Sequence, residues 1–254
     1  MAPEFTPGTD KTALLVIDMQ TLFKPMVSPS MTGNITSLVN YFRSLPVRNR
    51  AQQPHELGLV VFTQHGHTSE ELDVPSAEKS PSQLVRKWGI EGSTRVGTEG
   101  WEFLDWIQEL LGGAQVISSS DNIDRPSSPR LPAGRMSDHE HEKWQQQMQD
   151  DKSVILPKNT YDAFVNTHLE EVLKVHGIKR VVVCGVMTDC CCNTTARAAF
   201  NRGFETWLVK DACGSANETQ HGRGLDAFGY AFGNVMSTRE VMNKMDAISE
   251  DPFY

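Results

Sequence analysis

The stretch VVVCGVMTDCCCNTTARAAF, residues 181–200, decides the fold. It begins with a run of β-branched residues, turns at Gly185, and continues into an alanine-rich segment that favours a helix. A strand that leads through a short turn into a helix is the repeating unit of α/β proteins. The hydrophobicity of this strand is continuous rather than alternating, which is typical of a parallel strand covered by helices on both faces.

The same alternation of strand and helix continues along the rest of the chain. Apolar runs bounded by turn residues predict strands at residues 12–18, 58–64, 152–158, 179–185 and 205–212, with a weaker candidate at 233–238. Helical patterns lie between them, at residues 30–45, 100–111, 163–177, 190–202, 221–231 and 238–247. This order predicts an α/β protein with a three-layer α/β/α, Rossmann-like fold and a mostly parallel six-stranded sheet.

The composition narrows the class of protein. The 254 residues, 39% of them hydrophobic, are enough for one substantial core, so we expect a single domain over residues 1–254. The net charge of −8, with scattered Lys and Arg, argues against nucleic acid and membrane partners and favours a small-molecule substrate. The N-terminal MAPEFTPGTDKT has neither the basic nor the apolar part of a signal peptide, so we expect a cytoplasmic protein.

One segment interrupts the alternation. Residues 112–151 are rich in Ser, Pro and charged residues and separate a predicted helix from the strand at 152–158. A loop of this length in a compact domain is either functional or a solvated insertion. The sequence therefore predicts either a lid over the site or a surface excursion.

Chemistry-bearing side chains follow the predicted strands. Asp18, Lys158 and the cysteine cluster lie where the first, third and fourth strands end, and Gln64 and His65 end the second. Ligands of open parallel sheets bind beyond the carboxyl ends of the strands. Taken alone, Asp18 is typical of a turn and Lys158 of a solvated surface, but together these residues predict a site.

The cysteines need separate interpretation. Four of the five lie within nine residues, at positions 184, 190, 191 and 192, too close together to cross-link distant loops, so we expect reduced thiols. A thiol in the first turn of a helix faces free backbone N–H groups, which stabilise a thiolate. Neighbouring helical residues point about 100° apart, so only one of Cys190, Cys191 and Cys192 can face the site. The others are expected to pack as small apolar residues, and a purely structural cluster is the alternative.

The stretch GVMTDCCCNTTARAAFNRGFETWLVKDACGS, residues 185–215, resembles the cysteine-hydrolase branch of the isochorismatase-like family, which includes nicotinamidases and carbamoylsarcosine amidase. Its motif places the nucleophile at Cys191. The stretch ALLVIDMQ resembles the segment that carries the family's catalytic aspartate, here Asp18, and KNTYDAF the segment of its catalytic lysine, Lys158. GTEGWEFLDWI, residues 97–107, also matches, so the resemblance covers nearly the whole chain apart from the insertion.

The resemblance implies further features of the site. It predicts a cis peptide bond between Val186 and Met187, and an oxyanion hole formed by the backbone N–H groups of Met187 and Cys191. It implies hydrolysis of a small amide, lactam, ureide or carbamoyl compound through a thioester, without a cofactor. A homodimer or homotetramer is expected on the same basis.

Substrate contacts are predicted around this site. We expect them from Phe23, Gln64, His65, Tyr161 and Phe164, with Trp88 as a further aromatic at the mouth. His65 and His67 have a spacing that can suit a metal. Nicotinamidases carry an aspartate where this chain has His65, and no further histidine follows nearby. We therefore predict no metal and give the two histidines a structural or substrate-contacting role.

Two other functions are compatible with the same fold. Enzymes that cleave the enol ether of isochorismate use water directly, and the presence of Cys191 argues against that reaction. A non-catalytic redox sensor is also conceivable, because Cys213 adds a further thiol to the cluster. The combination of Asp18, Lys158 and Cys191 favours an enzyme.

Overall fold

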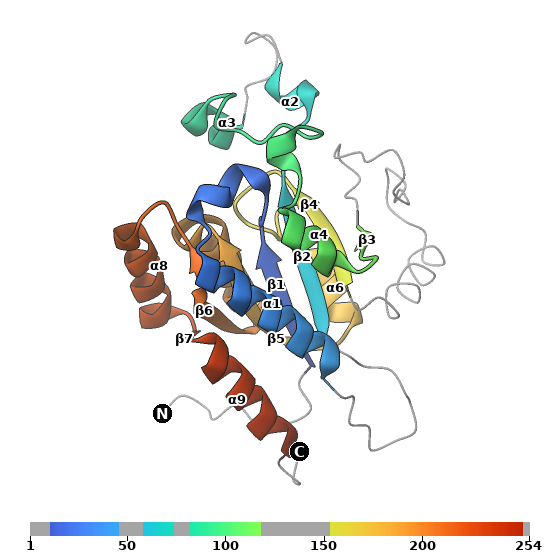
Figure 1. Ribbon diagram of the computed structural model, residues 1–254, viewed down its shortest axis with the longest axis vertical. Coiled ribbons are helices and arrows are strands. Elements are labelled where there is room, and N and C mark those ends of the chain that lie inside the picture. The colour runs from blue at the N-terminus through green and yellow to red at the C-terminus, as the bar shows by residue number, and fades with distance from the viewer. Residues whose placement is uncertain (1–10, 46–57, 74–81, 118–152, 251–254) are drawn as a thin grey trace.

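The computed structural model describes residues 11–45, 58–73, 82–117 and 153–250 (Figure 1). Most of the predicted insertion at 112–151 lies outside these residues, so the lid stays a prediction. The oligomeric state and the cytoplasmic location also stay predictions. In the described part of the chain, no helix has the length and apolar character needed to span a membrane.

The described strands form one parallel sheet in the order β3-β4-β2-β1-β5-β6-β7. The predicted α/β class is therefore confirmed. The sheet has seven strands rather than the predicted six, because two residues of the presumed insertion pair with β4. That strand is too short to produce a periodic signal in the sequence. The strands are β1 (Lys11–Ile17), β2 (Leu59–His65), β3 (Gln115–Val116), β4 (Ser153–Lys158), β5 (Ile178–Val186), β6 (Glu205–Gly214) and β7 (Asn234–Met236).

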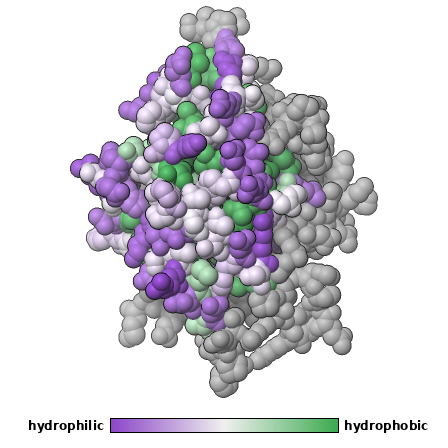
Figure 2. Space-filling view, in the orientation of Figure 1, coloured by the Kyte–Doolittle hydropathy of each residue, from purple (hydrophilic) through white to green (hydrophobic). Residues whose placement is uncertain are grey.

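Helices cover both faces of the sheet. α1 and α9 pack against each other and against β6, whereas α6 and α7 contact β5. Crossovers between parallel strands are right-handed, and the chain adds β2 on one side of β1 and β5 on the other. The helices of the two halves, α1 in the first and α6 and α7 in the second, therefore cover opposite faces of the sheet. The face in Figure 2 is mostly hydrophilic, with apolar areas in small patches. The helices are α1 (Pro29–Ser44), α2 (Ser69–Leu72), α3 (Gln83–Trp88), α4 (Asp105–Leu111), α6 (Leu169–Val175), α7 (Asn193–Asn201), α8 (Glu218–Ala231) and α9 (Thr238–Glu250).

Three predicted helices differ from the structure. The helix expected at 100–111 is divided into a 3-10 turn, η2 (Glu99–Trp101), and α4, because Phe103 between them pairs with Gln20. The helix expected at 163–177 is reduced to α6, because side chains ahead of it bond to the local backbone: the Thr160 hydroxyl donates to the Asp162 carbonyl, and the Asp162 carboxylate accepts from the Phe164 N–H. The helix expected at 190–202 is divided into a π-helical turn, η3 (Thr188–Cys192), and α7. Short 3-10 helices, η1 (Thr21–Met26) and η2 (Glu99–Trp101), complete the described elements.

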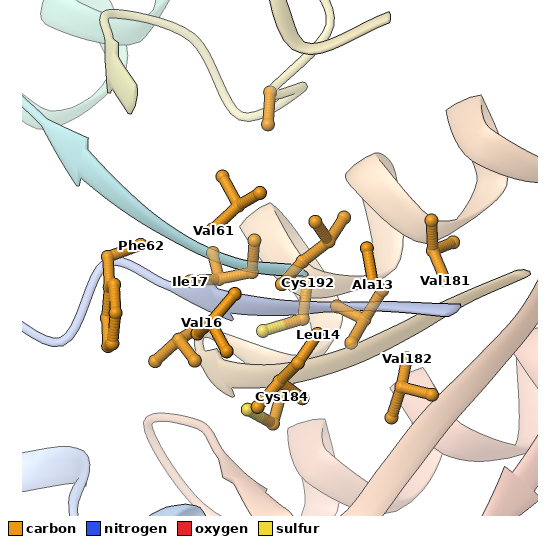
Figure 3. Close-up of a cluster of buried hydrophobic side chains, with 14 of the residues drawn as sticks. Ala13, Leu14, Val16, Ile17, Val61, Phe62, Val181, Val182, Cys184 and Cys192 are labelled. Atoms are coloured by element: carbon orange, nitrogen blue, oxygen red, sulfur yellow. The ribbon is translucent and has the colours of Figure 1, made fainter. Parts of the chain in front are cut away.

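Two of the cysteines belong to the hydrophobic core. Cys184 on β5 and Cys192 at the end of η3 lie among the apolar side chains of the central strands (Figure 3), and neither has an exposed surface. Both therefore pack as small apolar residues. Gly185, beside Cys184, has a φ of +114°, and a Cβ there would lie 2.2 Å from the Ile17 carbonyl oxygen. Only glycine fits where β5 passes the end of β1.

Candidate active site

Three side chains from distant parts of the chain meet at the carboxyl edge of the sheet. Asp18 directly follows β1, Lys158 ends β4, and Cys191 lies in η3, after β5. The Lys158 side chain reaches across the end of β2, and its Nζ donates to Asp18 Oδ2 at 2.6 Å. The Cys191 thiol lies close enough to the Asp18 carboxylate and the Lys158 ammonium for both groups to shift its pKa. All three side chains are buried.

The local backbone fixes the Asp18 carboxylate. Asp18 has a φ of +50°, a left-handed conformation that Asp adopts more readily than most residues. The Thr63 hydroxyl donates to Asp18 Oδ1 at 2.6 Å and accepts from the Asp18 N–H at 3.0 Å. With Lys158 on the other oxygen, both carboxylate oxygens have a fixed partner. Thr63 is not among the predicted site residues, and its one signal in the sequence is a polar residue inside a fully buried strand.

Lys158 remains an ammonium in this environment. Its burial lowers the pKa, but the charges of Asp18 and of an ionised Cys191 outweigh burial, and the pKa of Lys158 is raised overall. A second bond, to the Thr160 carbonyl at 2.9 Å, fixes the Lys158 side chain. The cation is therefore held beside the sulfur and the carboxylate.

The resting thiols of η3 are protonated at neutral pH. Burial raises the pKa of Cys191, and Asp18 adds to this effect while Lys158 opposes it. Burial and the Asp189 charge raise the pKa of the half-buried Cys190 to about 11. Burial and contact with Cys213 raise the pKa of Cys192 further. Of the three, only Cys191 has both an acid–base partner and a cation at its sulfur.

These shifts predict a loss of stability at alkaline pH. The pKa values of the fully buried Cys184, Cys191 and Cys192 thiols are higher in the folded protein than the ordinary value of about 8.5. As the pH rises the unfolded chain loses these protons first, so the stabilisation is complete below about pH 8 and is lost above it. Urea denaturation in reductant should show the free energy of unfolding falling by up to about 1.4 kcal/mol per thiol and pH unit. A flat profile from pH 8 to pH 10 would contradict these shifts.

The turn between β5 and η3 has an unusual backbone. The peptide bond between Val186 and Met187 is cis. The Met187 carbonyl accepts from the N–H groups of Cys190 and Cys192, both at 3.1 Å. The turn thereby presents the half-buried Met187 and the buried Cys191 at the same edge of the sheet.

Of the predicted contact residues, His65 and Tyr161 lie beside the three central groups. His65 pairs with Lys158 across β2 and β4, and its burial, Lys158 and His67 all lower its pKa, so the ring is neutral. Burial raises the pKa of Tyr161, and the charges of Cys190, Cys191 and Lys158 also act on it. Its hydroxyl accepts from Trp88 Nε1 at 2.6 Å.

The other predicted contact residues have partners within the fold. The Gln64 amide donates to the Trp101 carbonyl at 3.0 Å, and Phe164 stacks on Phe204. These internal contacts account for both side chains. Phe23, on η1, packs partly buried against the core.

The histidine pair does not form a metal centre with its neighbours. The rings of His65 and His67 meet edge to face with centroids 5.1 Å apart, and His67 Nδ1 lies 3.3 Å from Glu71 Oε2. In the described ranges, no three His, Cys, Asp or Glu side chains converge as a metal-binding group. The residues of this region therefore do not fit the metal that the nicotinamidase resemblance implies.

Two polar residues that sequence analysis did not assign support this wall of the site. The Gln20 amide donates to the carbonyls of His65 and Trp101 and accepts from the His65 N–H. Glu71 accepts from the Asn159 amide at 2.6 Å and so links α2 to the residue after Lys158. Both side chains join segments that are remote in the sequence, which no local pattern reveals.

A parallel α/β sheet with a thiol, a carboxylate and an ammonium in contact at its carboxyl edge is the arrangement of an α/β hydrolytic enzyme. The chain belongs to the isochorismatase family: a family model described as Isochorismatase domain matches residues 112–240, which confirms the resemblance. Nicotinamidase 3 of Arabidopsis thaliana is 31% identical over 230 residues, covering 89% of this chain and 85% of that protein. This relationship also confirms the predicted class of enzyme, a hydrolase of carbon–nitrogen bonds other than peptide bonds.

Solved structures share the fold. A cysteine hydrolase from Pseudomonas syringae pv. phaseolicola matches with a TM-score of 0.61 at 20% identity, over 94% of this chain and 93% of that one. An N-carbamoylsarcosine amidase from Thermoplasma acidophilum matches with a TM-score of 0.55 at 21% identity, over 91% and 98% of the two chains. At these identities the comparison supports the architecture alone.

Proposed function

We propose that this protein hydrolyses the carbon–nitrogen bond of a small amide, lactam, ureide or carbamoyl compound through a thioester on Cys191. The observation that carries the proposal is the buried contact of the Cys191 thiol with the Asp18–Lys158 ion pair. The nicotinamidase of Arabidopsis, an amidase by name, supports the same chemistry. The pair is 2.6 Å apart and its side chains are fully buried, so it is ready to exchange a proton with the sulfur.

The reaction follows from the properties of these groups. Asp18 takes the proton of the Cys191 thiol as the sulfur attacks the carbonyl carbon, and Lys158 stabilises the charges that develop. The N–H groups of Met187 and Cys191 bind the oxyanion, at about 3 to 4 kcal/mol per donor. Asp18 then gives its proton to the leaving nitrogen, and a thioester remains. Water activated by the same carboxylate releases the acid.

The surroundings of His65 suit a neutral, polar substrate. His65 Nδ1 is buried and has no hydrogen-bond partner among the described residues, and the ring is uncharged. An unpaired buried nitrogen costs about 1 to 3 kcal/mol, which a substrate N–H or carbonyl would relieve. We propose that His65, Tyr161 and Phe23 contact the substrate, with Trp88 holding the Tyr161 hydroxyl.

A hydrolysis screen tests the proposal. Nicotinamide, N-carbamoylsarcosine, simple ureides and lactams would be incubated with the protein, and acid-quenched samples analysed by peptide mass spectrometry. We expect release of the acid from at least one compound and an acyl mass on the peptide that contains Cys191. Isochorismate belongs in the same screen: its conversion without an adduct, with every amide untouched, would overturn the proposal in favour of enol-ether hydrolysis.

A further inference from the structure

The turn that carries Cys191 is held from behind by α8. Thr188, the first residue of η3, is completely buried, and its hydroxyl oxygen lies 2.8 Å from Nδ1 of His221. His221 lies in the first turns of α8, 33 positions along the chain. This bond therefore joins the start of the cysteine turn to a separate element of the fold.

The two elements also approach each other closely at Gly224. A Cβ on Gly224 would lie 3.0 to 3.2 Å from atoms of Asp189, and the Asn193 amide donates to the Gly224 carbonyl at 2.6 Å. The Ser215 hydroxyl bonds to the Asp189 carboxylate. These contacts fix the middle and the end of the turn. The bond between Thr188 and His221 is the side-chain contact that fixes its beginning.

The beginning of the turn determines where the sulfur lies. The Met187 carbonyl accepts from Cys190 and Cys192, on either side of Cys191, and the Thr188 carbonyl accepts from the Asn193 N–H. A displacement of residues 187 and 188 is therefore transmitted through these bonds to the residue between them. The position of Cys191 relative to Asp18 and Lys158 depends on it.

We infer that His221 is a positioning residue that acts through the Thr188 hydroxyl to hold the Cys191 thiol against Asp18 and Lys158. The part of the inference that concerns turnover rests on the proposed function, whereas the placement of the thiol does not. His221 has no contact with the reacting groups in this role. Its removal leaves the buried Thr188 hydroxyl without its partner, and the turn relaxes away from the ion pair.

The test uses two disruptive and two conservative variants. Thr188→Val and His221→Leu remove the bond, whereas Thr188→Ser keeps the hydroxyl and His221→Asn keeps a polar atom close to the position of Nδ1. His168→Leu, a change at a half-buried histidine of another helix, is the matched control. If His221→Leu does not fold, Thr188→Val, which preserves the shape of the side chain, carries the test.

Two readouts separate positioning from general stability. The first is the pH midpoint for alkylation of Cys191 by iodoacetamide, followed by peptide mass spectrometry. We expect it to move from its raised value toward that of an ordinary thiol in both disruptive variants, and to stay in place in the conservative variants and in the control. The second is kcat, on any probe that the wild type hydrolyses, which should fall about 10- to 100-fold with little change in KM.

The double variant completes the test. If both residues act through one bond, Thr188→Val/His221→Leu should be no slower than the worse single variant. An unchanged alkylation midpoint in the disruptive variants, or fully additive effects, would overturn the inference. If the wild type hydrolyses no probe, the proposed function fails, and the alkylation midpoint alone decides whether His221 positions the thiol.

Discussion

Cys191→Ala should abolish amide hydrolysis and leave the fold intact. The substitution removes the attacking sulfur, and neither Asp18 nor Lys158 can replace it, so we expect a loss of about 10⁴-fold or more in kcat. Alanine fits the same space, and the Asp18–Lys158 pair is retained. Hydrolysis of the best substrate from the screen would measure the first effect, and urea denaturation the second.

The neighbouring cysteines provide matched controls. Cys190 is half-buried and lies on another side of η3, and Cys192 is in the core (Figure 3). Cys190→Ala should therefore retain kcat within about 10-fold, because neither Asp18 nor Lys158 acts on the sulfur there. Cys192→Ala should lose about 1 kcal/mol of stability through lost packing, with most of the activity kept. Activity in Cys191→Ala, or its loss only in a neighbouring variant, would assign the nucleophile elsewhere.

The sequence predicts the meeting of the three central groups for a physical reason. Parallel strands end at one edge of the sheet, so residues that follow different strands become neighbours whatever their separation in the chain. Asp18, Lys158 and the cysteine turn each follow a strand whose continuous apolar run is unmistakable. The choice of Cys191 among its neighbours needed the family motif, because the helical spacing alone allowed any of the three.

The supporting residues could not be predicted in this way. Thr63 bonds to Asp18 across 45 positions, and Gln20 bonds to His65 across 45 and to Trp101 across 81. Each was visible only as a polar residue in or next to a buried strand, which shows that a partner is needed but not which one. His221 has no distinguishing pattern in the sequence at all. The register of the sheet and the packing of α8 on η3 determine these pairs.

Local bonding explains the errors in element boundaries. Thr160 and Asp162 are compatible with helical periodicity, yet their side chains bond to nearby backbone groups and keep the segment out of a helix until Leu169. This irregular segment also places the Thr160 carbonyl against Lys158. The segment directly ahead of the predicted helix is therefore part of the site.

Lys158→Met should lower both activity and stability. Without the ammonium, the thiolate and the oxyanion lose the cation that stabilises them, and we expect kcat/KM to fall by about 10³-fold or more. The same change leaves the Asp18 carboxylate buried without its partner, which costs about 3 to 5 kcal/mol. Hydrolysis assays and urea denaturation measure the two effects. Activity within 10-fold of the wild type would exclude Lys158 from the reaction.

The double variant Asp18→Asn/Lys158→Met separates these two effects. Asparagine also adopts the left-handed conformation found at residue 18 and can still bond to Thr63, so it removes the charge with little strain. With both charges gone, no unpaired ion remains in the core, and we expect most of the stability lost in Lys158→Met to return. The double variant should nevertheless stay inactive, because the sulfur has neither a proton acceptor nor a cation. A double variant as unstable as Lys158→Met would mean that the methionine itself packs badly, whereas a stable and active one would show that hydrolysis does not need the ion pair.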